Sequence, residues 1–163
     1  MKTLVRLFFL VLLVSALPAL AQDWSAVGSV GHVDESSVGS YEVNGPDIQF
    51  RTGVTGTIYA RYHVTNTYGS ATSFIPPWGR LVMGYFDNGN QVTIHARMMR
   101  VDLCTNTVTE LCEIKSTDSS LSHCGVCTLS QQVDFQNYAY YVEVDLNRSS
   151  TSGVAIVLHV GLQ

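Results

Sequence analysis

Apolar and polar residues alternate with a period of two through most of this chain, most clearly over residues 81–103. An apolar run from Leu81 to Phe86 reaches Asp87-Asn88-Gly89-Asn90, and residues 91–98 then alternate strictly. Asn-Gly favours a type I′ turn, which needs a positive φ at both central residues. We therefore expect a long β-hairpin whose second arm has one face in a core.

The apolar phase changes within the second arm of this stretch. Val92, Ile94, Ala96 and Met98 share one face, whereas the next apolar residues are Met99, Val101 and Leu103. A β-bulge, or a strand that passes from one sheet to another, produces such a shift.

Further segments have the same strand-like alternation. They cover residues 57–64, 138–146 and 154–162. Residues 108–114 and 127–135 are expected to form two more strands, and no segment longer than one turn has helical periodicity. Trp78 follows Pro76-Pro77 and is expected to fill the core beside a loop. About seven to nine antiparallel strands separated by turns predict an all-β fold, a single β-sandwich of the jelly-roll type.

The first residues have the three-part layout of a secretory signal peptide: Lys2 and Arg6, the apolar run 7–14, and Ala19-Leu20-Ala21. Cleavage after Ala21 gives a signal peptide over residues 1–21 and one β-sandwich domain over residues 22–163. The alternative is an uncleaved anchor, but the run is shorter than the roughly 20 residues that span a bilayer. The sequence thus predicts a secreted protein, extracellular, at the cell surface or periplasmic, with no membrane span after processing.

Charge and composition limit the classes of partner that we expect. Without Lys2 and Arg6 the chain has seven basic residues against thirteen acidic ones, a net charge of −6. Nucleic acids and anionic membranes need basic patches, so neither is an expected partner. Charged residues are sparse while Gly, Ser, Thr, Val and Tyr abound, which is typical of an extracellular β domain.

Several turn and strand motifs together resemble a family of secreted bacterial β-sandwich proteins of unknown function. These motifs are Asp34-Glu35-Ser36-Ser37, Asn44-Gly45-Pro46, Thr55-Gly56-Thr57-Ile58, Ala60-Arg61-Tyr62, Val64-Thr65-Asn66-Thr67, Pro77-Trp78-Gly79, Tyr85-Phe86-Asp87-Asn88, Arg100-Val101-Asp102-Leu103 and Tyr138-Ala139-Tyr140-Tyr141-Val142. The resemblance implies a bacterial, exported β-sandwich. It supplies no catalytic residue.

Four cysteines, Cys104, Cys112, Cys124 and Cys127, predict two disulfides and no free thiol in an exported chain. The favoured pairing is Cys104 with Cys112 and Cys124 with Cys127. The alternative brings Cys112 beside Cys127 and Cys104 to Cys124. Redox chemistry at Cys124-x-x-Cys127 lacks the helix that it requires, and a zinc site of the four cysteines with His123 has atypical spacing.

Other catalytic and metal-binding patterns are weak. The sequence has no Gly-x-Ser-x-Gly elbow for acyl transfer. A glycoside hydrolase needs paired carboxylates, for which the candidates are Glu143, Asp145, Asp134 and Asp102. Asp87-Asn88-Gly89-Asn90 resembles part of a calcium loop but lacks the downstream glutamate. We therefore predict no catalytic residue, no metal ligand and no cofactor.

Outward-facing strand positions give the main functional hypothesis. His63, His95 and His159 occupy such positions and would share a face if their strands lie in one sheet; otherwise they are separate solvent-facing residues. Exposed strand faces are usually rich in Thr, Ser and Lys, whereas Tyr and Arg are enriched where proteins meet. The predicted interface therefore consists of Tyr59, Arg61, His63, His95, Arg97, Tyr141 and Glu143.

Three functions remain, in this order. The first is a non-enzymatic surface or matrix protein that acts by self-association or adhesion, with itself as partner in a homo-oligomer. The second is a carbohydrate-binding module that recognises a surface glycan. Its aromatic platforms would be Trp24, Trp78, Tyr59, Tyr68 and Tyr141. The third is a small secreted hydrolase.

Overall fold

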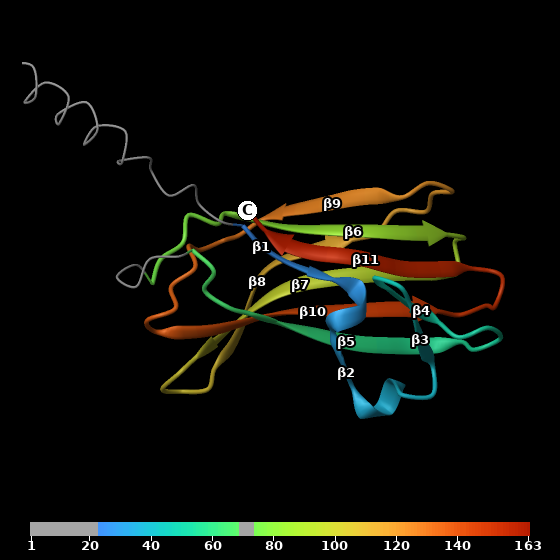
Figure 1. The fold of residues 1–163 in the computed structure, drawn as a ribbon, viewed down its shortest axis with the longest axis horizontal. Helices are drawn as coiled ribbons and strands as arrows, with labels where there is room; N and C mark the ends of the chain where they lie inside the picture. Colours follow the sequence, from blue (N-terminus) through green and yellow to red (C-terminus); the bar gives the residue numbers. More distant parts are fainter. Residues whose placement is uncertain (1–22, 69–73) are drawn as a thin grey trace, which may run out of the picture.

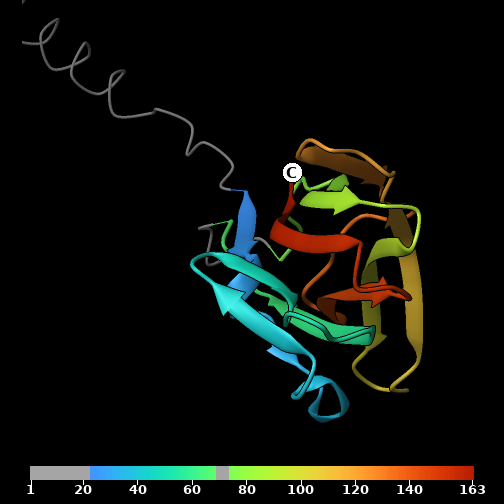
Figure 2. The same cartoon turned by 90° about the vertical axis from the view of Figure 1, so that its right-hand side faces the viewer.

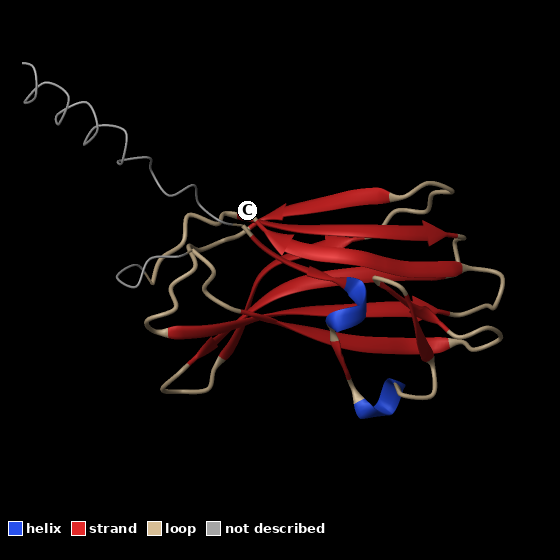
Figure 3. Cartoon of the chain, viewed as in Figure 1, coloured by secondary structure: helices blue, strands red, loops and turns tan. Residues whose placement is uncertain are grey.

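A computed structural model describes residues 23–68 and 74–163, which form two antiparallel β-sheets packed face to face (Figures 1 and 2). The strands are β1 Trp24–Val27, β2 His32–Val33, β3 Tyr41–Asn44, β4 Asp47–Phe50, β5 Gly56–Val64, β6 Arg80–Asn88, β7 Val92–Asp102, β8 Val108–Lys115, β9 His123–Thr128, β10 Tyr138–Arg148 and β11 Val154–Leu162. In this part of the chain, the helical segments are two single 3₁₀ turns, η1 Gly28–Val30 and η2 Glu35–Ser37 (Figure 3).

The six-stranded sheet has the order β3-β4-β11-β6-β9, with β1 also paired to β11, and the five-stranded sheet has the order β2-β5-β10-β7-β8. Figure 1 shows the long strands of both sheets running along the longest axis of the molecule. The predicted β-sandwich is confirmed. Eleven strands replace the expected seven to nine because residues 24–50 form four strands of only two to four residues.

Inward-facing residues of both sheets fill the core between the layers. Complete burial of one Val, Leu or Ile side chain contributes roughly 1.5–3 kcal/mol, so these positions dominate stability. The fully buried strand residues include Ile58, Ala60, Leu81, Met83, Ile94, Ala96, Met98, Val142, Val144, Leu146, Val157, Val160 and Leu162. Trp78, only 1% exposed, fills the core as predicted, with the ring of Phe135 edge-on to it at 6.1 Å between centroids.

The predicted hairpin over residues 81–103 is wrong, although both of its strands exist. β6 pairs with β11 and β9 in one sheet, whereas β7 pairs with β10 and β8 in the other. Within the turn Gly89 has a positive φ, 115°, and Asn88 is the last residue of β6, so the type I′ requirement is not met. The turn carries the chain from one sheet to the other. Alternation specifies which face of a strand is buried, but not the strand with which it pairs.

The predicted irregularity after Met98 is present as a shift of register between β7 and β8. The register of β7 against β8 shifts between Met98 and Met99, where the apolar phase of the sequence changes. The additional residue is Leu111 of β8, because Met98 pairs with Cys112 and Met99 with Glu110, whereas β7 pairs with β10 without a break. Met99 and Val101 therefore lie on the outer side of β7, and the expected change of face within β7 is wrong.

One disulfide, between Cys112 and Cys127, joins β8 of the five-stranded sheet to β9 of the six-stranded sheet. The favoured pairing of Cys104 with Cys112 is therefore wrong, and half of the alternative is present. Cys104, in the turn after β7, and Cys124, on β9, are free and exposed, which differs from the predicted two disulfides. The zinc alternative also fails, because two of its four thiols are in the disulfide.

The predicted signal peptide, residues 1–21, lies outside the described residues. Within residues 23–68 and 74–163, no helix is long and apolar enough to cross a membrane.

Candidate functional site

The structure places all seven residues of the predicted interface on the outer side of the five-stranded sheet. They lie on three neighbouring strands, and the register aligns Arg61 of β5 with Glu143 of β10 and Glu143 with Arg97 of β7. The ion-paired residues Asp145 of β10 and Glu113 and Lys115 of β8 lie on the same side. We call this surface the charged face. It is defined by Tyr59, Arg61, His63, His95, Arg97, Glu113, Lys115, Tyr141, Glu143 and Asp145.

Charges alternate across the strands of this face. The Nε of Arg61 donates to Glu143 at 3.3 Å, and Glu143 is also 3.6 Å from Nη2 of Arg97. Arg97 in turn donates to Asp145. Opposite charges on adjacent strands hold one another in place. Among the described residues, Nε of Arg97 is buried and has no hydrogen-bond partner.

The far side of the charged face continues this arrangement. Glu113 lies 3.2 Å from Nδ1 of His95 and 3.2 Å from Nζ of Lys115. Burial by itself lowers the pKa of Arg97, but Asp145, Glu143 and Glu113 outweigh it and raise that pKa. The guanidinium therefore stays protonated.

Two tyrosine side chains lie among the charged residues of this face. Tyr59 is opposite Asp145 and 41% exposed, while Tyr141 is half-buried between His63 and Met99. The tryptophans expected as aromatic platforms are instead in the core: Trp24 is 6% exposed and Trp78 1%. Tyr59 and Tyr141 are thus the aromatic residues of the predicted set that remain available on the charged face.

A hollow of about 190 Å³ adjoins the charged face at its β2–β5 edge. Its floor is apolar and includes Trp24 and Tyr62, and its rim carries His32, Arg61 and His63. The hydroxyl of Tyr62 donates to the carbonyl of Gly28 at 2.8 Å, and burial raises the pKa of Tyr62. An apolar floor with a few convergent polar groups is the usual character of a small-molecule site.

The histidine prediction is only partly confirmed. His63 and His95 share the charged face, but His159 is on β11 of the other sheet, where its ring packs over Gly84. The phase of a strand could not reveal this, because all three residues face outward on their own strands.

The outer side of the six-stranded sheet has a different character. Five of its outward positions are apolar and half-buried or exposed, although polar residues such as Arg80 and Gln49 also face outward. We call the apolar part of this surface the apolar face, defined by Val82, Phe86, Val126, Ile156 and Leu158. Val126, on the edge strand β9, is 55% exposed, and the free Cys124 lies on the same side.

The four carboxylates considered for glycoside hydrolysis do not converge. Glu143 and Asp145 share an arginine on the charged face. Asp102 instead accepts backbone hydrogen bonds from Thr105 and Cys104, which lower its pKa, and Asp134 caps the backbone at Gln136. A general acid needs a raised pKa.

The Asp87 turn, considered as a calcium loop, contains a buried carboxyl. Asp87 is 2% exposed and accepts a hydrogen bond from the hydroxyl of Ser116. Burial, with the nearby charge of Asp118, raises its pKa. Among the described residues, no three His, Cys, Asp or Glu side chains group as metal ligands.

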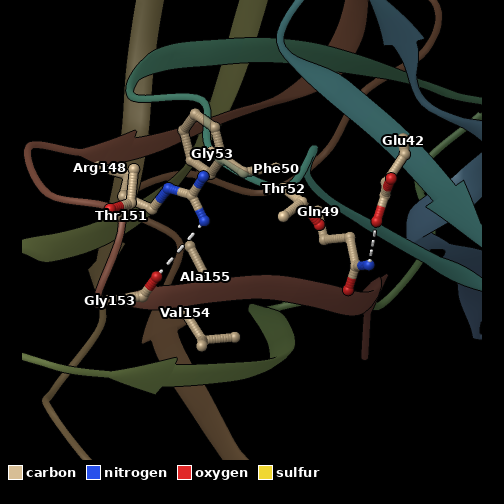
Figure 4. Close-up of a pocket in the computed structure, with 10 residues that line it drawn as sticks. All are labelled: Glu42, Gln49, Phe50, Thr52, Gly53, Arg148, Thr151, Gly153, Val154 and Ala155. Carbon is tan, nitrogen blue, oxygen red and sulfur yellow. Dashed lines mark hydrogen bonds between the residues drawn. The ribbon is translucent and has the colours of Figure 1, made fainter.

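A second cavity, of about 220 Å³, opens at the end of the sandwich between the β4–β5 and β10–β11 connections (Figure 4). Its wall contains Arg148, which is 7% exposed. Arg148 is not among the site residues predicted from the sequence. A signal was present, because Arg148 continues the inward series Tyr140, Val142, Val144 and Leu146, and a charge at a core position is unusual.

No protein-family model matches the chain, and no curated protein matches it. Solved structures with similar strand arrangements include a family 61 carbohydrate-binding module in complex with β-1,4-galactotriose, at 11% identity and a TM-score of 0.42, with 86% of this chain and 87% of that one covered. A xylan-binding domain of family 22 has 15% identity and a TM-score of 0.38, covering 89% and 88%. A family 29 module with cellulohexaose has 12% identity and a TM-score of 0.31, covering 88% and 83%. At such values, the function of this chain must be inferred from its own residues.

Proposed function

We propose that this protein is a non-enzymatic carbohydrate-binding domain that binds a glycan across the charged face. This reverses the order of the sequence-based hypotheses, in which self-association came first. The observation that carries the proposal is the fixed row of paired charges beside exposed Tyr59 and the apolar-floored hollow.

The chemistry of sugars fits such a surface. Hydroxyl groups bind well to guanidinium and carboxylate groups that are already held in place, because little side-chain entropy is lost on binding. The apolar side of a sugar ring packs against an aromatic ring such as that of Tyr59. Because Arg61, Arg97 and Lys115 are already paired with carboxylates, a neutral glycan fits the face better than a strongly charged partner.

The test begins with a glycan array probed with the mature domain, residues 22–163. Isothermal titration calorimetry with the best glycan then compares wild type with Tyr59→Ala and Arg61→Ala. Each substitution is expected to weaken binding about tenfold, since each removes an aromatic or charged contact. Arg80→Ala, on β6 of the other sheet, is the matched control and leaves the affinity unchanged. An array without any hit, or an affinity that both substitutions leave intact, contradicts the proposal.

Self-association is a second candidate, favoured by the apolar face. Exposed contiguous apolar surface marks contact sites, and β9 is an edge strand next to it. A second copy of the chain would then pack on Val126 and its neighbours rather than on the predicted interface. Light scattering from about pH 5 to about pH 8 measures the oligomeric state, and substitutions on each surface show which surface forms the contact. Val126→Glu dissolves an oligomer built on the apolar face, whereas Arg97→Ala and Tyr141→Ala dissolve one built on the charged face.

Export through a cleaved signal peptide remains part of the proposal. The Cys112–Cys127 disulfide supports it, because disulfides persist in oxidising compartments. Intact mass of the protein recovered outside the cytoplasm should correspond to a chain that begins at Gln22. A species that keeps residues 1–21 would mean a tethered protein.

A further inference from the structure

Arg148 carries a buried charge that no carboxylate neutralises among residues 23–68 and 74–163. Its guanidinium donates only to backbone carbonyls, to Val54 at 2.8 Å, to Arg51 at 3.0 Å and to Gly153 at 3.4 Å. It also lies over the ring of Phe50, 4.7 Å from the centroid. In the part of the chain that the structure describes, Arg148 forms no ion pair with Asp or Glu. Burial lowers its pKa, which reflects the cost of an unneutralised charge.

The cavity beside Arg148 has two chemically different sides. Figure 4 shows Arg148 and Phe50 on one side and Gln49 and Glu42 on the other. The Nε2 of Gln49 donates to Glu42 at 2.7 Å, so that carboxylate is turned toward Gln49 and away from Arg148. A cation at one side and an amide–carboxylate pair at the other favour a ligand with a carboxylate at one end and hydroxyl groups at the opposite end.

We propose that this cavity binds a uronic acid, the carboxylated unit of an acidic glycan, with its carboxylate against Arg148 and its hydroxyls toward Gln49 and Glu42. The inference rests on the proposed glycan binding and adds a second, charge-selective site. The volume of about 220 Å³ is below the roughly 300–1,000 Å³ of pockets for drug-sized ligands, so one terminal sugar unit is the fitting size. An acidic peptide would supply the carboxylate but not the vicinal hydroxyls that Gln49 and Glu42 can bind.

The test is an NMR titration of the ¹⁵N-labelled mature domain with glucuronate and with galacturonate. At least one acid is expected to shift the amides of Gly53, Gly153 and Ala155. Glucose, the methyl ester of glucuronic acid and acetate are the matched probes, each lacking either the charge or the hydroxyls. We expect them to bind at least about tenfold more weakly, because hydrogen bonds to charged groups contribute most to affinity.

Three variants complete the design. Arg148→Gln should abolish binding of the acid, and Gln49→Ala should weaken it several-fold while the fold is kept. Arg80→Gln, an exposed arginine elsewhere on the six-stranded sheet, should leave it unchanged. If Arg148→Gln does not fold, Gln49→Ala and the neutral probes still decide the matter.

The result that overturns the inference is equal binding of acid and neutral sugar at this cavity, or no shift there with either acid. Amides of Tyr59 and Arg61 report separately on the charged face. If a neutral glycan shifts the amides of Tyr59 and Arg61 but neither acid shifts the amides of the cavity, only this inference is overturned. If an acid shifts the amides of the cavity but no glycan shifts those of Tyr59 and Arg61, only the proposed function is overturned.

Discussion

The outer faces of the two sheets differ in their chemistry. The charged face is a grid of alternating arginine and carboxylate side chains, with Tyr59 and Tyr141 between them. The apolar face offers Val82, Phe86 and Val126, which have little hydrogen-bonding capacity. Both sheets contribute buried residues to the core, so the outer positions are free to differ. The charged face is therefore suited to polar contacts of fixed direction, whereas the apolar face is suited to apolar contacts that need no fixed direction.

The largest expected effect concerns the covalent link between the two sheets. Cys112→Ser together with Cys127→Ser removes a crosslink that closes a 15-residue separation, and the free energy of unfolding should fall by about 3 kcal/mol. Chemical denaturation measures this loss. Cys104→Ser, which changes a free exposed thiol, is the control and should stay within about 0.5 kcal/mol. Equal effects of both changes would mean that the sheets do not depend on this link.

A smaller effect is expected within the charged face. Arg97→Ala leaves Glu143 and Asp145 without their shared cation and should cost about 1–2 kcal/mol of unfolding free energy. Lys115→Ala removes a side chain that is 64% exposed and should change stability by less than about 0.5 kcal/mol. Urea denaturation compares the two. If they cost the same, the grid of charges is not held in place as described.

Asp87, at the end of β6, gives a pH-dependent test. Its folded-state pKa is raised by burial, so its contribution to stability is present at low pH and is lost as the pH rises through the folded pKa. Asp87→Asn removes the buried charge and should raise the melting temperature by a few degrees at about pH 7, but not at about pH 3. Scanning calorimetry at both pH values measures it, with exposed Asp23→Asn as control. A gain at low pH would contradict this sign.

The sequence was sufficient to predict the sandwich and the position of a register irregularity after Met98. Alternation determines which side of a strand faces the core, and burial of that side is the strongest physical constraint on it. The seven residues of the predicted interface share one face because β5, β10 and β7 are neighbours in one sheet, which alternation alone does not specify.

Strand pairing, in contrast, could not be predicted, because it depends on contacts between segments far apart in the chain. The turn at Gly89 was taken for a hairpin although it connects the two sheets, and His159 was grouped with histidines of the other sheet. The pairing of Cys112 with Cys127 could not be predicted for the same reason, because it depends on which strands lie close together. The two buried charged residues of the described part of the chain, Asp87 and Arg148, lie at or next to the ends of strands, where the core meets the connecting segments.

The most direct test of the account is an NMR map of the glycan selected by the array, recorded on the ¹⁵N-labelled mature domain. The account predicts shifted amides on β5, β7 and β10 around Tyr59, Arg61 and Glu143, and unchanged amides at Val82 and Val126. Shifts confined to the apolar face, or shifts on the charged face that persist undiminished in Arg61→Ala, would contradict it.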